Sequence, residues 1–165
     1  MTSLTADRYD NLTAGSFRRL VHALLATENN SLLTLLRITL GVVMLPHGLQ
    51  KTAGWFGGYG YTGTMGWFAS LGIPAILGFL AIAAETAGAV ALIAGITTRI
   101  AAFGVAVTLA VAATMHAANG FFMNWSGQQK GEGFEFHILA IAIAVVLMIG
   151  GAGRFSIDRA ITKNA

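Results

Sequence analysis

Four long apolar segments dominate the chain and are separated by shorter polar or glycine-rich segments. They extend over residues 32–50, 73–95, 99–119 and 134–150. Each has close to the roughly 20 residues that an α-helix needs to cross the hydrocarbon core of a bilayer. The pattern therefore predicts an all-α membrane protein, in which residues 31–153 form an antiparallel four-helix transmembrane bundle.

The composition supports a membrane environment. The chain has 165 residues, of which 55% are hydrophobic and only 10% are charged, whereas soluble domains carry about 25% charged residues. The chain contains no cysteine, which excludes disulfides, zinc–thiolate sites, iron–sulfur clusters and thiol redox chemistry. The net charge of +3 is small, and we expect no nucleic-acid partner.

Lysine and arginine residues are unevenly distributed between the two ends of the predicted bundle. Eight lie on the side of the chain termini, and two lie on the opposite side. The eight are Arg8, Arg18, Arg19, Arg37, Arg99, Arg154, Arg159 and Lys163; the two are Lys51 and Lys130. Because cytoplasmic segments carry the excess of positive charge, this distribution predicts that both termini are cytoplasmic.

The two terminal segments are predicted to lie outside the bilayer. Residues 1–30 form a cytoplasmic arm, in which residues 12–26 have the pattern of a short amphipathic helix at the membrane surface. The alternative is a basic flank that only sets the orientation. Residues 154–165 form a basic tail. Its arginines are expected to bind lipid phosphates, and Asp158 is expected to pair with Arg154 or Arg159.

A glycine motif in the segment between the first two helices raises the question of nucleotide binding. Residues 58–63, GYGYTG, fit the pattern G-x-G-x-x-G, and Glu85 follows about twenty residues later. A dinucleotide-binding turn requires a preceding strand and a following helix. This motif instead follows a predicted transmembrane helix, so we reject NAD as a ligand.

The same segment, residues 51–72, is predicted to be a long external loop rich in glycine and aromatic residues. Its glycines permit tight turns, and its tryptophan, tyrosine and phenylalanine side chains suit the headgroup level of the membrane. The functional alternative is a lid over a lateral site, because long ordered loops often carry function.

Ionisable residues inside membrane helices are costly, so each requires a partner or a role. Arg37 lies near the inner start of the first helix, and Glu85 lies about 15 Å from the inner end of the second at ~1.5 Å per residue. Because an arginine side chain can span the difference in depth, we predict an Arg37–Glu85 ion pair. The alternative is that Arg37 extends to the cytoplasmic interface while Glu85 is protonated.

A second group of polar residues is predicted near the outer side of the membrane. His47 and Lys51 are four residues apart and share one helix face, and His116 lies late in the third helix. Glu135 and His137 begin the fourth helix, where a separation of about 200° prevents both from facing the same partner. The group therefore predicts a polar pocket that contains one of these two side chains.

Three interpretations of this pocket remain open. The histidines are typical metal or haem ligands, but their spacing matches no short ligand motif and we predict no metal. Histidine and lysine also suit hydrogen bonding to the carbonyl oxygens of a quinone, with a carboxylate exchanging protons. The third interpretation is a mutually satisfied polar cluster that holds the helices in register or forms a docking face.

Several longer motifs resemble the DoxX family of small bacterial membrane proteins. They are LRITLGVVMLPHGLQK, GWFGGYGYTGTMGWFASLGIP, the AAETAGAVALIAGITTRIAA segment and the closing GGAGRFSIDR. The family pattern corresponds here to Arg37, His47, Gly48, Lys51, Glu85, Arg99, Arg154 and Asp158. The resemblance implies a four-helix protein of the bacterial inner membrane, related to a subunit of thiosulfate:quinone oxidoreductase.

Together, the resemblance and the pocket suggest an oxidoreductase subunit that acts at the quinone pool. His47, Lys51, Glu85 and Glu135 are then the catalytic candidates, and His47, His116 and His137 are the candidates for holding a quinone. The alternative function is a non-enzymatic membrane anchor or scaffold for a redox partner protein, and a less favoured one is a small transporter or channel. Homo-oligomerisation is compatible with all three.

Overall fold

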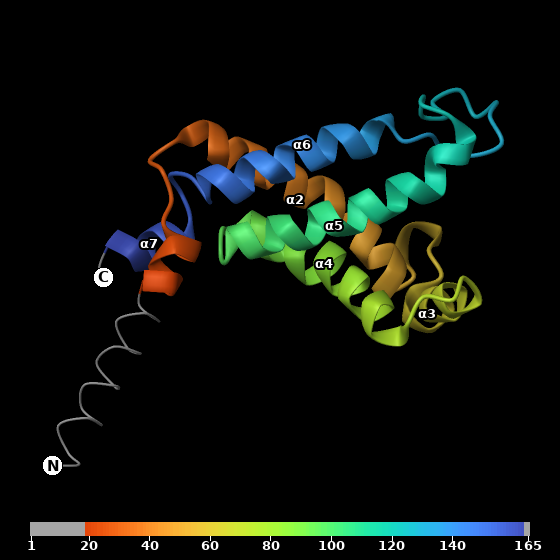
Figure 1. Ribbon diagram of the computed structural model, residues 1–165, viewed down its shortest axis with the longest axis horizontal. Coiled ribbons are helices and arrows are strands. Elements are labelled where there is room, and N and C mark those ends of the chain that lie inside the picture. The colour runs from red at the N-terminus through yellow and green to blue at the C-terminus, as the bar shows by residue number, and fades with distance from the viewer. Residues whose placement is uncertain (1–18, 164–165) are drawn as a thin grey trace, which may run out of the picture.

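The computed structural model describes residues 19–163, and all regular structure within this range is helical (Figure 1). Residues 19–25 are helical and are followed by α2 (Ser31–Thr52), η1 (Trp55–Gly57), α3 (Gly60–Ser70), α4 (Ala75–Ala94), α5 (Thr98–His116), η2 (Ala117–Asn119), α6 (Glu135–Gly150) and α7 (Ile157–Lys163). The prediction of an all-helical protein is confirmed for this part of the chain. What was predicted for residues 1–18 lies outside the described residues.

Three of the described helical segments are long and apolar enough to cross a membrane. They are Ser31–Thr52, Ala75–Ala94 and Thr98–Asn119. The fourth apolar helix, α6, has 16 residues and is therefore about 24 Å long at 1.5 Å per residue. Its crossing of the bilayer and the cytoplasmic location of both termini stay predictions.

The four apolar helices form a closed arrangement in which each packs against two others. Helix α2 packs against α4 and α6, and α5 packs against the same two helices. Their interior is filled by small and medium apolar side chains, among them Met44, Ala89, Val105 and Leu147, each at most 1% exposed. Large apolar side chains cover the outer faces of the helices, as expected for contact with lipid.

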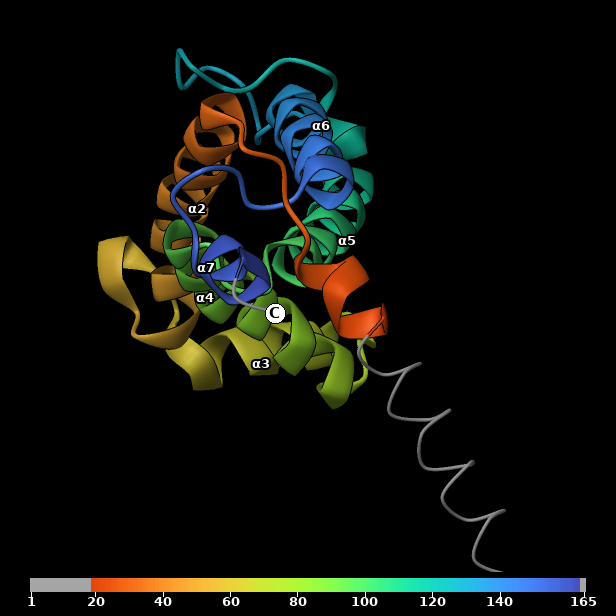
Figure 2. The same ribbon diagram turned by 90° about the vertical axis from the view of Figure 1, so that its left-hand side faces the viewer.

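The two ends of this arrangement carry different structures. Helix α3 and the segment between α5 and α6 lie at one end, while residues 19–25 and α7 lie at the other (Figures 1 and 2). The second end is joined by backbone hydrogen bonds, including one from the Glu28 N–H to the Gly150 carbonyl. We call the first end the α3 end and the second the α7 end.

The segment predicted as a long loop is largely helical. The chain turns at Gly57, the last residue of η1, and at Gly60, the first residue of α3, which have positive φ angles of 78° and 67°. Helix α3 then incorporates most of the GYGYTG motif, which is preceded by η1 and α2 and not by a strand. The prediction of a loop was wrong here because glycines at both ends of a short helix were interpreted as turns throughout.

Helices α2 and α4 approach each other closely through two glycines of α2. A Cβ atom at Gly41 would lie 2.7 Å from the Ile93 side chain, and one at Gly48 would lie 2.6 Å from the Glu85 carbonyl oxygen. Side chains are excluded at Gly41 and Gly48 because the atoms they would meet on α4 include backbone atoms, which cannot move aside as a flexible side chain can. This close approach brings the end of α2 beside Glu85.

Replacing Gly48 by valine is expected to lower the thermal unfolding temperature of the purified protein. The new side chain would overlap the backbone of Glu85 and force α2 and α4 apart, and overpacking of this kind costs about 1–3 kcal/mol. The matched control is Gly66→Val in α3, where a Cβ atom meets nothing within 4 Å. Equal unfolding temperatures for the two variants would contradict the close helix contact.

Two arginines bind the carboxyl ends of helices at the α7 end. The last carbonyl groups of a helix lack intrahelical donors, and Arg37 donates to those of Leu92 and Ile93 at the end of α4. Arg99 donates in the same way to Met148 and Ile149 at the end of α6. Positive charge at a helix carboxyl terminus is also favoured by the helix dipole.

The carboxyl-terminal segment is part of the same end of the fold. The carboxylate of Asp158 is 1% exposed and accepts hydrogen bonds from the backbone N–H groups of Thr97 (2.7 Å) and Thr98 (2.9 Å) at the start of α5. The expected pairing of Asp158 with Arg154 or Arg159 is therefore wrong. Arg154 is exposed and lies over the Phe155 ring.

Candidate functional site, a polar cavity at the α3 end

A small cavity lies between the four apolar helices at the α3 end. Its volume is about 180 Å³. Most of the predicted polar residues contribute to its wall, together with apolar side chains from α2, α5 and α6. The lining residues are Met44, His47, Lys51, Glu85, Leu109, Ala112, His116, Met123, Glu132, Phe136 and His137. The structure thus brings residues of all four helices and of the α5–α6 segment to one site.

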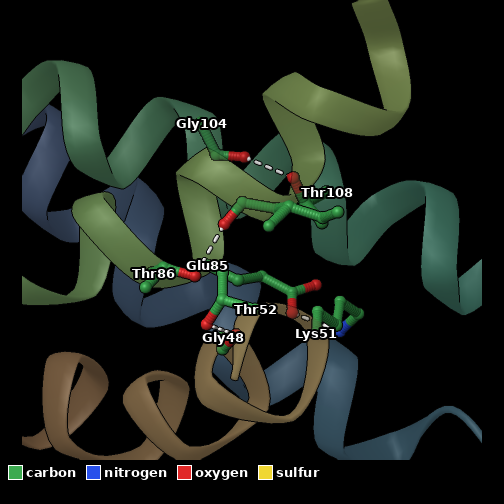
Figure 3. A network of polar contacts seen from close by, with 8 residues as sticks. Gly48, Lys51, Thr52, Glu85, Thr86, Gly104 and Thr108 are labelled. Atoms are coloured by element: carbon green, nitrogen blue, oxygen red, sulfur yellow. Dashed lines mark hydrogen bonds and ion pairs between the residues drawn. The ribbon is translucent and has the colours of Figure 1, made fainter. Parts of the chain in front are cut away.

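The centre of the wall is an ion pair between α2 and α4. The Lys51 ammonium group donates to the Glu85 carboxylate, and the two side chains point toward each other across the helix contact (Figure 3). The Glu85 side chain is 6% exposed and that of Lys51 is 26% exposed. A charged carboxylate buried to this extent needs a cationic partner, and Lys51 supplies it.

Three histidines surround the remaining space. The ring centroids of His116 and His137 are 5.1 Å apart, and the His47 ring is 6.3 Å from that of Phe136. His137 is 7% exposed, and its Nδ1 atom is buried without a hydrogen-bond partner. Because this atom is inaccessible even to water, it is the remainder of the ring that lines the cavity.

The two acidic residues of the α5–α6 segment have different positions. Glu135 does not line the cavity; its Oε1 atom accepts hydrogen bonds from the Met123 N–H and the Trp125 indole N–H, each at 3.0 Å. Glu132 lines the cavity, and its carbonyl oxygen lies 3.1 Å from His116 Nδ1. The geometry therefore does not support Glu135 as a catalytic residue, and Glu132 is a lining residue that the sequence analysis missed.

The predicted Arg37–Glu85 ion pair is wrong. Glu85 pairs with Lys51, and Arg37, which is 1% exposed, lies toward the α7 end, where it donates to the carbonyl oxygens of Ala152 at 3.0 Å and Leu92 at 2.6 Å. The arginine points away from Glu85 because the unpaired carbonyl groups at the end of α4 accept its hydrogen bonds. The rise per residue along the two helices places Arg37 within reach of Glu85, but it does not account for the carbonyl groups that compete for Arg37.

The arrangement suits hydrogen bonding and proton exchange better than metal binding. Within residues 19–163, no group of three or more His, Asp or Glu side chains has the geometry to hold a metal ion. The cavity instead presents an ammonium–carboxylate pair together with three imidazoles. These groups can donate to carbonyl oxygens and can release or accept protons.

These observations define an all-helical membrane protein with a polar cavity between its apolar helices near one end. The family model of DoxX matches residues 32–118, more than half of the chain. The protein therefore belongs to the DoxX family, as the motifs had indicated. The matched region covers α2 to α5 and ends before α6.

No curated protein and no solved structure was found that matches this chain. The family assignment thus supports a membrane protein. The chemistry of the cavity depends on its own residues.

Proposed function

We propose that the cavity binds the head group of a membrane quinone and that the protein is an oxidoreductase subunit of the bacterial inner membrane. In this proposal α6 is the fourth transmembrane helix and both termini are cytoplasmic. The observation that carries the proposal is a single cavity lined by three histidines, His47, His116 and His137, together with Lys51 and Glu85. A quinone carbonyl oxygen accepts hydrogen bonds, and imidazole N–H and ammonium groups donate them.

The side chains of the cavity then have separate roles. His137 and His47 hold the two ends of the head group, and Lys51 stabilises negative charge that develops on a ring oxygen. Reduction of a quinone to a hydroquinone consumes two electrons and two protons. Glu85 and His116 exchange the protons, while the electrons come from a redox partner protein, because the cysteine-free chain provides no thiol donor.

The alternative proposal is a non-enzymatic scaffold that recruits a redox partner. The observation that favours it is that Lys51 and Glu85 satisfy each other directly, so their charges are explained without a ligand. In this case the cavity is a structural polar cluster, and the protein is expected to contain no quinone when purified.

Replacing His137 by phenylalanine is expected to remove bound quinone from the protein. The protein is purified gently from its native membrane, and quinone is extracted and quantified by mass spectrometry. The variant leaves a carbonyl oxygen of the quinone without its hydrogen-bond donor, which costs about 1–3 kcal/mol. We therefore expect the quinone content to fall about tenfold or more.

The matched control is His22→Phe, which makes the same change at an exposed histidine of residues 19–25. It is expected to retain the quinone content of the native sequence. Quinone-free protein of native sequence, accompanied by a co-purifying protein, would replace this proposal with the scaffold. Equal quinone in both variants would remove His137 from the site.

A further inference from the structure

A second, larger cavity lies beside the first at the α3 end. It has a volume of about 680 Å³ and is open on one side. It lies between the end of α2, η1 and the first turns of α3, and is lined by Gln50, Lys51, Gly57, Gly58, Tyr59, Gly63, Thr64 and Trp67. Three of these eight residues are glycines, and a Cβ atom at Gly57 would meet nothing within 4 Å. The space therefore exists because this segment carries few side chains.

The two cavities differ in chemistry. The first contains three histidines and two carboxylates in addition to Lys51. The second contains one charged side chain, that of Lys51, and is flanked by the exposed aromatic rings of Tyr59 and Trp67. Aromatic side chains of this kind are favoured at the level of the lipid headgroups. The second cavity is thus suited to the apolar part of a ligand and the first to its polar part.

Lys51 connects the two spaces. Among the described residues that line either cavity, it alone lines both. Its ammonium group is directed to Glu85, as Figure 3 shows, while its side chain remains 26% exposed, and Glu85 lines only the first cavity. A lysine side chain has several rotatable bonds, so its movement changes the wall between the cavities without movement of a helix.

We propose that the second cavity is the lateral binding site for the apolar tail of the ligand, and that the head group passes Lys51 to reach the histidines. This inference rests on the proposed function, since it assigns the path and the tail of the same quinone. It explains why a glycine-rich helix with exposed aromatic rings lies directly against the ion pair. It also commits the ligand to an amphipathic molecule that enters from the bilayer.

The absence of cysteine from the chain allows a direct test. Tyr59 directly precedes α3 and lines the second cavity, whereas Tyr61 is an exposed residue of the first turn of α3 that does not. Each is replaced by cysteine in turn, Tyr59→Cys and Tyr61→Cys, and the purified protein is labelled with a bulky maleimide. Binding is measured before and after labelling, so each variant is its own control for folding.

The probes are a long-tailed ubiquinone in detergent and a tail-less dimethoxy-methyl-benzoquinone with the same head group. Labelling of Tyr59→Cys is expected to weaken binding of the long-tailed quinone by about tenfold or more, because the buried apolar area of the tail is lost. Binding of the tail-less quinone and both affinities of labelled Tyr61→Cys are expected to change less than about twofold.

The outcomes separate the two proposals. If both quinones bind before labelling and the Tyr59 and Tyr61 variants respond equally to it, the second cavity is not the tail site, while the proposed function stands. If neither quinone binds to the unlabelled protein, the proposed function fails and this inference fails with it. If labelling of Tyr59→Cys, but not of Tyr61→Cys, abolishes the binding of both quinones, the tail assignment is also overturned. The label would then be blocking the head group.

Discussion

Replacement of Arg37 by methionine is expected to prevent stable folding. The guanidinium group is 1% exposed and donates to four backbone carbonyl groups, those of Leu92, Ile93, Ala152 and Phe155. Methionine fills much of the same volume but donates to none of them. At about 1–3 kcal/mol for each buried acceptor left unpaired, the loss is a large part of the roughly 5–15 kcal/mol that stabilises a typical domain.

The measurement is the yield of monodisperse protein in detergent and its thermal unfolding temperature. The matched control is Arg154→Met, which makes the same change at an exposed arginine of the same end. We expect the control to unfold at nearly the temperature of the native sequence and Arg37→Met to be recovered poorly. An Arg37→Met protein as stable as the control would show that water or other donors satisfy the four carbonyl groups.

The second large effect is expected at the Lys51–Glu85 ion pair. Lys51→Met leaves the Glu85 carboxylate buried without its cation, and removal of one partner of a buried pair costs about 3–5 kcal/mol. The double variant Lys51→Met/Glu85→Gln has no uncompensated charge and is expected to recover most of the lost stability. Unfolding temperatures of both single variants and the double variant form a double-mutant cycle that measures this coupling.

Quinone-linked turnover measured on the same proteins distinguishes a structural role of the Lys51–Glu85 pair from a chemical one. If Lys51 and Glu85 take part in the proposed chemistry, the stable double variant is expected to have lost quinone-linked turnover. If the double variant is both stable and fully active, the pair is purely structural, and the proposed chemical roles of Lys51 and Glu85 are wrong. A single Lys51→Met variant of native stability would mean that Glu85 is already protonated in the protein.

The helices were predictable from the sequence because hydrophobic segments of sufficient length leave few alternatives. The predicted segments 73–95 and 134–150 differ from α4 and α6 by at most two residues at either end. The packing of the helices against one another depends on close contacts that the hydrophobic pattern of the sequence does not predict. Gly41 and Gly48 were two glycines among 21, and only the backbone of α4 distinguishes them.

The candidate site was predictable in outline and not in its pairings. His47, Lys51 and His116 were placed together near the outer side of the membrane, with one of Glu135 or His137, and the structure brings these three and His137 to one cavity. The partner of Glu85 could not be predicted because backbone carbonyl groups compete with Glu85 for Arg37. Recognising this competition requires knowing where three segments of the chain end. Glu132 lies in an irregular segment, where no repeat predicts the direction of a side chain.

The contacts of Asp158 and Arg37 have a consequence for the order of events during synthesis. Asp158 binds the start of α5, and Ala152 and Phe155 accept hydrogen bonds from an arginine of α2. These residues leave the ribosome after α2, α4, α5 and α6. Part of the hydrogen bonds of Arg37 can therefore form only once residues 152–155 have been synthesised. A product truncated directly after α6 would contain the four apolar helices but lack these contacts, and we expect it to be degraded by membrane quality-control proteases.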